Sequence, residues 1–340
     1  MIKASIIGGT GYMGFELLRL LVRHPQVQLR EITSRSNAGT KISDVHPALN
    51  GFIEEDFVAD LTKPADNDIV FVAAPHGASM DIVPSLIDAG CRVIDLSGDY
   101  RLGNIDDYKK WYGKKHTDRT NLAKAVYGLT ELNRTKIAKA QLVANPGCYP
   151  TGALLALIPA AKANVIGGDV VVDSKSGTSG AGAAPGDFTH HPSCASNVLP
   201  YKVGKHRHTP EIEGTLKSIG SNFGEISFTP HLVPLVRGIQ TSCYVRLSKG
   251  AKIEGVLQKY QEFSKKNHFI KIVEGTPRIT SVLGSNYCHI SVAMASKSLL
   301  AAFSVIDNLC KGGSGQAVQN MNVMFGLDEE TGIDTPGLGV

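Results

Sequence analysis

The sequence predicts an α/β protein in which a doubly wound parallel sheet precedes a second domain with a mixed sheet. Three observations support this. Short apolar strands alternate with helices in the first half, a glycine-rich turn joins the first strand to the first helix, and the alternation stops near residue 148. The length of 340 residues also suits two domains better than one core.

Each expected element rests on an apolar run of suitable length and period. In the first half we expect strands over 2–7, 27–33, 69–74, 92–96 and 141–144, with helices over 14–23 and 79–89. In the second half we expect helices over 151–163 and 253–266, with strands over 169–174, 226–229, 240–247, 271–273 and 288–295. A last helix begins near Gly315 and is expected to return to the first domain. The expected domains are therefore 1–147 with 310–340, and 148–309.

Composition and charge disfavour several classes of protein. Hydrophobic residues make up 42% and charged residues 19%, which is ordinary for a globular enzyme, and no apolar run reaches the roughly 18 residues of a membrane span. The net charge of +4 comes without a long basic run, so nucleic acid is not an expected partner. The first residues predict a strand rather than a secretion signal, and the six cysteines are scattered, so we expect a reduced, cytoplasmic protein. No metal is expected, because histidines and cysteines lack ligand spacing.

The turn after the first strand, Gly8-Gly9-Thr10-Gly11-Tyr12-Met13-Gly14, carries the G-x-G-x-x-G spacing of a dinucleotide-binding turn. Its glycines let the backbone approach a pyrophosphate, and the following helix offers N–H groups and a positive dipole end. A tight turn without a ligand is the plain alternative.

The end of the second strand indicates which dinucleotide binds. Ser34, Arg35 and Ser36 stand where an NAD enzyme carries an acid, and hydroxyls with a guanidinium suit a 2′-phosphate. We therefore expect NADP(H) as the cofactor. Glu31 within the strand is the competing acid, and Arg35 is also compatible with a solvated loop.

Cys148 is the candidate nucleophile. It lies between the strand 141–144 and an apolar helix, where the helix N-terminus stabilises a thiolate and an oxyanion on the attacked carbonyl. Position alone leaves a structural thiol equally open. Cys91, Cys243 and Cys288 lie in or beside strand-like runs and are expected in the core.

Residues 205–212 supply the candidate base. His206 and His208 would point to the same side if the segment is extended. Thr209 is expected to cap a helix that begins at Pro210, and Glu211 in its first turn is placed to orient an imidazole. A basic, solvent-facing helix start is the plain alternative.

Together these motifs resemble the N-acetyl-gamma-glutamyl-phosphate reductase family, type 1, of the aspartate-semialdehyde dehydrogenase superfamily. The combination of NPGCYPT with HRHTPEI is highly specific. The resemblance runs nearly end to end, through GGTGYMG at 8–14, TSRS at 33–36, AAPHG at 73–77, LSGDYRL at 96–102, NPGCYPT at 145–151, SGTSGAG at 176–182, YKVGKHRHTPEI at 201–212, FTPHLVPLVRG at 228–238 and NLCKGGSGQAVQNMN at 308–322.

The resemblance implies a Rossmann domain and an α+β catalytic domain like that of glyceraldehyde-3-phosphate dehydrogenase, with Asn308 and the C-terminal helix near the nicotinamide. It implies Cys148 as nucleophile and His208 as acid/base, supported by His206 and Glu211. The implied cofactor-binding residues are Gly8, Thr10, Gly11, Tyr12, Met13, Gly14, Ser34, Arg35, Ser36, Pro75, Ser97, Ser176, Gly177 and Asn308. The implied substrate-binding residues are Arg101, Asn145, Ser179 and Arg237.

The implied reaction is NADPH-dependent reduction of N-acetyl-gamma-glutamyl phosphate to N-acetylglutamate 5-semialdehyde and phosphate, in arginine biosynthesis. The Cys148 thiolate attacks the acyl phosphate, a thioester forms, hydride reduces it, and His208 protonates the oxygen. One departure concerns the acyl group, because Ala183 stands where many relatives carry an arginine. Relatives form dimers or tetramers, so a homodimer or homotetramer acting on a small molecule, away from membranes, is expected.

Two alternatives remain open at this point. A sister reductase would act on aspartyl phosphate, or on carrier-linked aminoadipyl or glutamyl phosphate. Aspartate-semialdehyde dehydrogenases lack the HRHTPEI run, which argues against that version. A regulator that senses NADP through a dead site is of a different class, and the intact Cys148, His208 and Glu211 argue against it.

Overall fold

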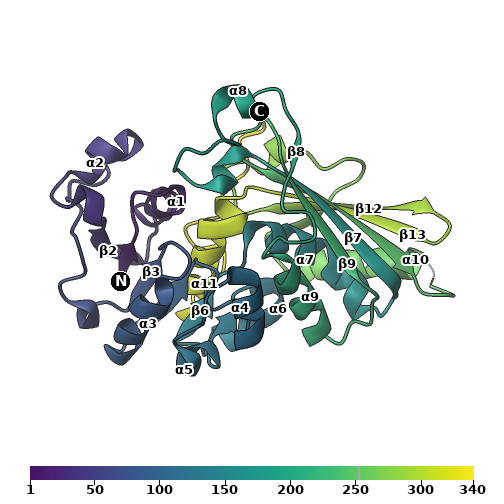
Figure 1. Ribbon diagram of the computed structural model, residues 1–340, viewed down its shortest axis with the longest axis horizontal. Helices are drawn as coiled ribbons and strands as arrows, with labels where there is room; N and C mark the ends of the chain where they lie inside the picture. The colour runs from purple at the N-terminus through teal and green to yellow at the C-terminus, as the bar shows by residue number, and fades with distance from the viewer. Residues whose placement is uncertain (252) are drawn as a thin grey trace. The chain divides into compact units, whose positions relative to one another are not determined.

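A computed structural model describes residues 1–251 and 253–340. The chain divides into two units (Figure 1): residues 1–146 with 313–334, and residues 147–312 with 335–340. Residues 147, 310–312 and 335–340 were expected in the first domain but lie in the second unit. Long-range contacts explain the difference, because Gly312 lies against Cys148 and the backbone of Leu338 bonds to that of Leu283.

The first unit is built on a parallel sheet with the strand order β2-β1-β3-β4-β6-β5. The order reverses beside β1, and ligands of open α/β sheets bind at the carboxyl ends of the strands near such a point. The glycine-rich turn follows β1 directly. The strands are β1 (Ile2–Ile7), β2 (Val27–Thr33), β3 (Ile69–Val72), β4 (Arg92–Asp95), β5 (Val126–Tyr127) and β6 (Leu142–Ala144). The two-residue β5 was not expected.

The last helix of the chain returns to this unit, as expected. It packs against two other helices and β4, and every one of its residues is buried. In Figure 1 it is the yellow helix α11. The helices of the unit are α1 (Tyr12–Leu21), α2 (Ile42–Val45), α3 (Ser79–Asp88), α4 (Ile105–Tyr112), α5 (Arg119–Leu122), α6 (Thr130–Ile137) and α11 (Gly315–Met324). Of these, α2, α4, α5 and α6 were not identified from the sequence.

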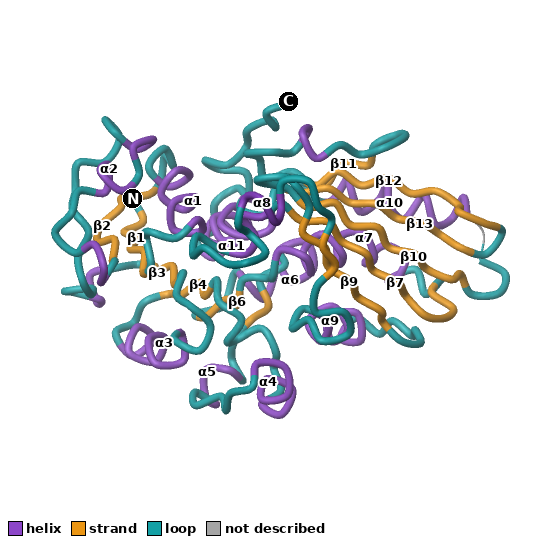
Figure 2. Tube along the Cα trace, turned by 45° about the horizontal axis from the view of Figure 1, so that its top comes forward, coloured by secondary structure: helices purple, strands orange, loops and turns teal. Residues whose placement is uncertain are grey.

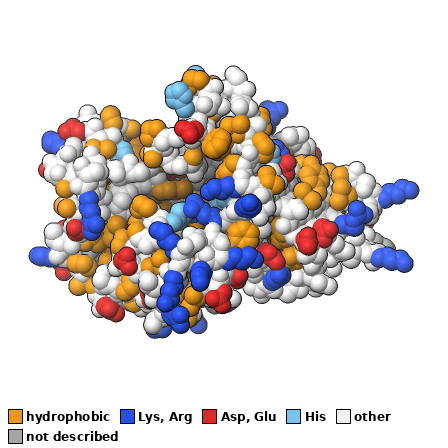
Figure 3. All heavy atoms as spheres, viewed as in Figure 1, with side chains coloured by type: hydrophobic (Ala, Val, Ile, Leu, Met, Phe, Trp, Pro, Cys, Tyr) orange, Lys and Arg blue, Asp and Glu red, His pale blue; other side chains and the backbone are white. Residues whose placement is uncertain are grey.

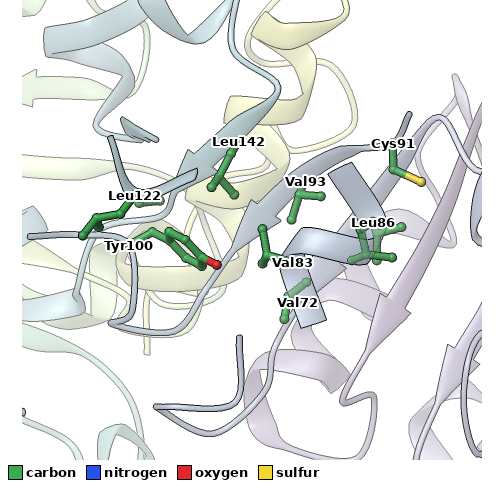
Figure 4. Close-up of a cluster of buried hydrophobic side chains, with 10 residues drawn as sticks. Val72, Val83, Leu86, Cys91, Val93, Tyr100, Leu122 and Leu142 are labelled. Atoms are coloured by element: carbon green, nitrogen blue, oxygen red, sulfur yellow. The ribbon is translucent and has the colours of Figure 1, made fainter. Parts of the chain in front are cut away.

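A buried cluster holds α3 against the sheet (Figure 4). Val72 on β3 and Val93 on β4 face Val83 and Leu86 of α3. Burial of each such side chain contributes about 1.5–3 kcal/mol. Cys91 is fully buried in the same cluster, so its interpretation as a core residue is confirmed.

The second unit carries the expected mixed sheet, in the order β11-β12-β13-β10-β7-β9-β8. The pairs β11–β12 and β7–β9 are parallel and the other neighbours are antiparallel. The sequence did not identify β13, although it lies between β12 and β10. The strands are β7 (Ile166–Ser176), β8 (Leu199–Pro200), β9 (Ile226–Leu232), β10 (Ile239–Leu247), β11 (Ile270–Ile272), β12 (Cys288–Ser296) and β13 (Leu299–Ile306).

One helix, α7 (Cys148–Lys162), is buried all round from Tyr149 to Ala161. It packs on β10 and β13 and contacts α9 (Thr209–Ser218) and α10 (Ile253–Lys266), and Figure 2 shows α7 and α10 beside these strands. The remaining helix is α8 (His191–Cys194). Cys243 on β10 and Cys288 on β12 are buried, as expected.

The visible surface carries both signs of charge. On the face shown in Figure 3, lysine and arginine side chains are interspersed with acidic ones. Within the described ranges, no helix has the length and apolar character needed to span a bilayer.

Candidate active site

The turn after β1 contains glycines where a side chain would clash with the backbone and one glycine where it would not. Gly8 has a φ of +90°, and a Cβ there would lie 2.5 Å from the carbonyl oxygen of Ala73. A Cβ on Gly14 would lie 2.3 Å from the carbonyl oxygen of Gly8. Gly11 precedes α1, and a Cβ there would meet nothing within 4 Å. Packing therefore explains Gly8 and Gly14, whereas the open space at Gly11 suits a pyrophosphate at the helix N-terminus.

Two residues that the sequence analysis missed hold this turn in place. The Nε2 atom of His46 lies 2.9 Å from the carbonyl oxygen of Gly9, and since a carbonyl only accepts, Nε2 carries the proton. The hydroxyl of Ser314 donates to the carbonyl oxygen of Met13 at 2.8 Å. Both contacts join segments far apart in the chain, so no local spacing signalled them.

The end of β2 gathers the three residues expected at a 2′-phosphate. The hydroxyls of Ser34 and Ser36 lie 3.3 Å apart. The guanidinium of Arg35, which stands between these serines in the chain, forms an ion pair with Asp60 at 2.9 Å. The Arg35 side chain is 83% exposed and the Asp60 side chain is 68% exposed. An ion pair this exposed contributes little. The exchange of Asp60 for an anionic ligand would therefore cost Arg35 little.

Glu31, the competing acid, is engaged elsewhere. Its carboxylate accepts from the backbone N–H of Thr62 at 3.0 Å and from the Thr62 hydroxyl at 2.6 Å. The side chain is thus directed toward Thr62 from within β2, which favours NADP(H) over NAD(H) at this strand end.

The loops after β3 and β4 contain the next two expected cofactor residues. Pro75 is exposed in the first loop. Ser97 is buried in the second, where its hydroxyl donates to Asp95 at 2.8 Å. Burial raises the pKa of Asp95 to about 6, opposed by the hydrogen bonds from Ser79 and Ser97. The Ser97 side chain thus stabilises the loop as well as lying at the carboxyl edge of the sheet.

Arg101 and Asn145, expected to bind substrate, connect the ends of β4 and β6. Arg101 donates to the carbonyl oxygens of Leu96 and Asn145 at 2.9 and 2.8 Å. The buried amide of Asn145 donates to the carbonyl oxygen of Gly313 at 3.0 Å and accepts from Asn320 at 3.1 Å. Both side chains therefore stabilise the strand ends, and their contacts with substrate stay predictions.

Cys148 is the first residue of α7, which confirms its expected place at a helix start. Its side chain is partly exposed. The backbone N–H of the preceding Gly147 donates to Oε1 of Glu211 at 2.7 Å, and Glu211 is buried in the first turn of α9. The carboxylate that was expected to orient an imidazole thus binds the backbone beside the thiol.

The two histidines meet across a turn rather than along an extended segment, so that part of the expectation is wrong. His208 has φ −81° and ψ −13°, and its backbone N–H donates to Nδ1 of His206 at 3.2 Å. Their ring centroids are 4.7 Å apart. The ring of Tyr149, next to Cys148, lies 5.7 Å from His206 and 5.9 Å from His208. This contact brings both imidazoles to the start of α7.

The start of α9 also differs by one residue. The helix begins at Thr209 and its N-cap position is His208, so the expected cap at Thr209 is wrong. The turn that places His208 against His206 ends where the helix begins, because the backbone N–H of Thr209 bonds to the carbonyl oxygen of His206 at 2.9 Å. The expected acid/base therefore occupies the N-cap itself.

Electrostatics separates the roles of the two histidines. Burial lowers the pKa of His206 to about 3, and the charges of Arg207 and Lys202 act in the same direction. His206 is therefore neutral at physiological pH, with its proton on Nε2 because Nδ1 accepts from His208. The acid/base role of His208 stays a prediction.

Asn308 brings together residues that were expected to bind cofactor and substrate. Its buried amide donates to the hydroxyl of Ser179 at 3.0 Å and accepts from the backbone N–H of Gly238 at 2.7 Å. Ser176, at the end of β7, donates to the carbonyl oxygen of Gly177 at 2.9 Å. These contacts order the loop after β7, and the binding roles of its residues stay predictions.

Arg237, the expected substrate-binding cation, has an internal partner that the sequence analysis missed. Its guanidinium lies 3.0 Å from the carboxylate of Asp307, which is fully buried. Asp307 also accepts from the backbone N–H groups of Gly284 at 2.7 Å and Leu309 at 2.8 Å. The pair fixes the guanidinium, which remains a quarter exposed.

Comparison with known proteins identifies the family. The model of the semialdehyde dehydrogenase NAD binding domain matches residues 3–140, and that of the semialdehyde dehydrogenase dimerisation domain matches residues 148–308. The chain is 48% identical to the N-acetyl-gamma-glutamyl-phosphate reductases of Methanosphaera stadtmanae and Methanocaldococcus jannaschii, covering 99% of this chain and 98% and 99% of theirs. The chain belongs to the N-acetyl-gamma-glutamyl-phosphate reductase family.

Solved structures support the fold of this family member. The aspartate semialdehyde dehydrogenase II of Vibrio cholerae, complexed with ASA, matches with a TM-score of 0.73 at 19% identity, over 96% of this chain and 98% of that one. The aspartate semialdehyde dehydrogenase of Candida albicans, with NADP, matches with a TM-score of 0.72 at 17% identity and the same coverage. These matches confirm the expected fold class.

Gly312 is a further residue of the reductase site that the sequence analysis did not single out. A Cβ on Gly312 would lie only 2.9 Å from the Cβ of Cys148. Its backbone N–H bonds to the carbonyl oxygen of Asp307 at 2.9 Å, so the backbone is not free to withdraw. The glycine lets this segment approach Cys148 closely.

Proposed function

We propose that this family member reduces N-acetyl-gamma-glutamyl phosphate to N-acetylglutamate 5-semialdehyde and phosphate, as a step of arginine biosynthesis. The observation that carries the proposal is Cys148 at the start of α7, beside a backbone N–H held by Glu211. Relatives that bear this reductase name, at 45–48% identity over 99% of the chain, support the choice of acyl group. A cytoplasmic homo-oligomer is proposed on the resemblance alone.

The open position at Gly11 suits a bound dinucleotide. Residues 8–14 would hold its pyrophosphate, and Ser34, Arg35 and Ser36 would hold the 2′-phosphate of NADPH. Bound NADPH supplies the hydride that reduces the acyl group. Further cofactor contacts are proposed for Pro75, Ser97, Ser176, Gly177 and Asn308.

Cys148 begins the reaction as a thiolate, which the positive end of the α7 dipole stabilises. Its sulfur attacks the carbonyl carbon of the acyl phosphate, the carbon–oxygen bond to phosphate breaks, and inorganic phosphate leaves. The acyl group then remains on Cys148 as a thioester. Arg101, Asn145, Ser179 and Arg237 are proposed to position the substrate during this step.

His208 serves as the acid/base of the second half of the reaction. It gives a proton to the oxygen of the reduced carbonyl, and takes that proton back when the carbon–sulfur bond breaks and the aldehyde leaves. The thiolate of Cys148 is regenerated. His206 accepts from the backbone of His208 and, being neutral, holds the acid/base in place without competing for its proton.

The test measures phosphate-dependent reduction of NADP⁺ with N-acetylglutamate semialdehyde and, in parallel, with aspartate semialdehyde. We expect turnover with the first aldehyde and little with the second. Cys148→Ser should abolish turnover while NADPH still binds, as followed by fluorescence titration. Cys243→Ser in the buried sheet is the matched control and should retain activity. Turnover of aspartate semialdehyde alone, or full activity of Cys148→Ser, would refute the proposal.

A further inference from the structure

Residues 201–205 form a tight turn between β8 and the histidines. The backbone N–H of Tyr201 bonds to the carbonyl oxygen of Pro230 at 3.1 Å, and that of Lys205 bonds to the carbonyl oxygen of Lys202 at 2.9 Å. Inside the turn, Lys202 has a φ of +47°. Among the described residues, Asn164 is the only other non-glycine residue with a positive φ.

The conformation of Lys202 costs stability. The left-handed region costs an L-residue roughly 1–2 kcal/mol, and asparagine tolerates it because its short polar side chain bonds locally. Lysine has no such compensation. Residues held in unfavourable backbone regions cluster at functional sites, where the side chain is needed in one place.

The charge of Lys202 lies beside the catalytic histidines. The ring of Tyr201, the residue directly before Lys202, lies 5.5 Å from that of His206, which in turn lies 4.7 Å from that of His208. The charges of Arg207 and Lys202 also lower the pKa of His206. Arg207 also acts on Tyr201. Burial raises the pKa of Tyr201 to about 12, and the charge of Cys148 acts in the same direction while Arg207 opposes it. The hydroxyl of Tyr201 donates to that of Tyr149, the residue after Cys148, at 3.1 Å. The two cations are therefore chain neighbours of Tyr201 and His206, whose rings lie beside the start of α7.

No protein group in the described part of the chain neutralises Lys202. Its side chain is exposed, and among the described residues its ammonium group forms neither an ion pair nor a hydrogen bond. The exposed ammonium group is therefore open to an anionic ligand, and the binding of that ligand would offset the backbone cost of Lys202.

We propose that Lys202, with Arg207, binds the carboxylate of the substrate's amino-acid part. This rests on the proposed function, whose substrate carries a carboxylate at the far end of its carbon chain from the reacting carbonyl. The phosphate leaves in the first step, whereas the carboxylate stays through the thioester and the aldehyde. A cation that holds the carboxylate thus keeps the carbonyl at Cys148 in both halves of the reaction.

The experiment replaces Lys202 by asparagine, which tolerates the left-handed backbone and removes the charge. In phosphate-dependent NADP⁺ reduction, Lys202→Asn should raise the KM for N-acetylglutamate semialdehyde by roughly tenfold, the size of one lost charged hydrogen bond. The KM for phosphate and the melting temperature should not change. Lys205→Asn is the matched control, because Lys205 lies in the same turn but is not among the charges that act on His206. It should leave both KM values and the melting temperature unchanged.

An analogue whose α-carboxylate is an amide tests the assignment directly. The wild type should bind it more weakly than the natural aldehyde, whereas Lys202→Asn should have the same KM for both. If Lys202→Asn raises the KM for phosphate instead, the lysine binds phosphate and the proposal is overturned. Unchanged KM values for both the aldehyde and phosphate in Lys202→Asn would also overturn it. A wild type that does not turn over N-acetylglutamate semialdehyde refutes the proposed function itself, a result visible before any variant is made.

Discussion

Oε1 of Glu211 lies 2.7 Å from the backbone nitrogen of Gly147, so one carboxylate joins the start of α9 to the start of α7. Gly147 immediately precedes Cys148, and Glu211 lies one turn beyond His208. This buried hydrogen bond to a charged group, a strong kind of hydrogen bond, therefore helps to hold the proposed nucleophile in register with the proposed acid/base.

Removal of the Glu211 carboxylate should weaken the site. Glu211→Ala leaves the buried N–H of Gly147 without this acceptor, which should cost about 1–3 kcal/mol of stability and lower kcat as Cys148 moves. Glu211→Gln keeps an acceptor oxygen and should retain most of the stability. Chemical denaturation and steady-state kinetics measure the two effects. Wild-type stability and kcat in Glu211→Ala would show that this bond does not hold the helices in register.

The buried His206 should make stability depend on pH. In the unfolded chain the pKa of His206 is about 6.5, whereas burial lowers it to about 3 in the folded protein. Between these values the unfolded chain binds more protons, so the free energy of unfolding falls as the pH drops from 6.5 toward 3, by at most about 1.4 kcal/mol per pH unit.

The measurement for His206 is urea unfolding at several pH values for the wild type and His206→Gln. The substitution should flatten the acid side of the stability profile. His24, His116 and His289 also have lowered pKa values and are present in both proteins, so the difference isolates His206. If the stability profiles of the wild type and His206→Gln are parallel, then folding does not lower the pKa of His206.

A methyl group at Gly312 should disturb the nucleophile. Gly312→Ala would place a Cβ 2.9 Å from that of Cys148, so we expect a lower kcat and slower alkylation of the thiol by iodoacetamide. Gly255→Ala in α10, where a Cβ meets nothing within 4 Å, is the matched control and should leave both unchanged. Equal kcat in the two variants would show that the segment yields without moving the thiol.

Arg35 should set the preference between the two nicotinamide cofactors. Arg35→Ala should raise the KM for NADPH roughly tenfold and change that for NADH little, because only NADPH carries the 2′-phosphate. Asp60→Asn removes the competing partner of Arg35 and should lower the KM for NADPH. An equal effect of Arg35→Ala on both cofactors would contradict the assignment of these residues to the 2′-phosphate.

Local patterns were sufficient to predict the features that depend on neighbouring residues. The glycine turn follows β1 because its spacing satisfies both a tight bend and the start of α1. Cys148 lies at a helix start because the apolar run 153–161 follows it closely. Strand β13 was missed although its apolar run is clear, and the two-residue strands β5 and β8 are too short for periodicity to reveal.

Only the tertiary structure decided which of the expected site residues meet. Glu211 binds Gly147 across 64 positions of the chain, and Asn308 binds Ser179 across 129. Such contacts depend on how α9 packs on α7 and how β13 ends beside β10, which no local spacing encodes. The sequence by itself therefore determined the chemistry that Cys148 can perform. Packing determined that His206 is neutral and that Glu211 holds the helix start, because burial and long-range hydrogen bonds exist only in the folded chain.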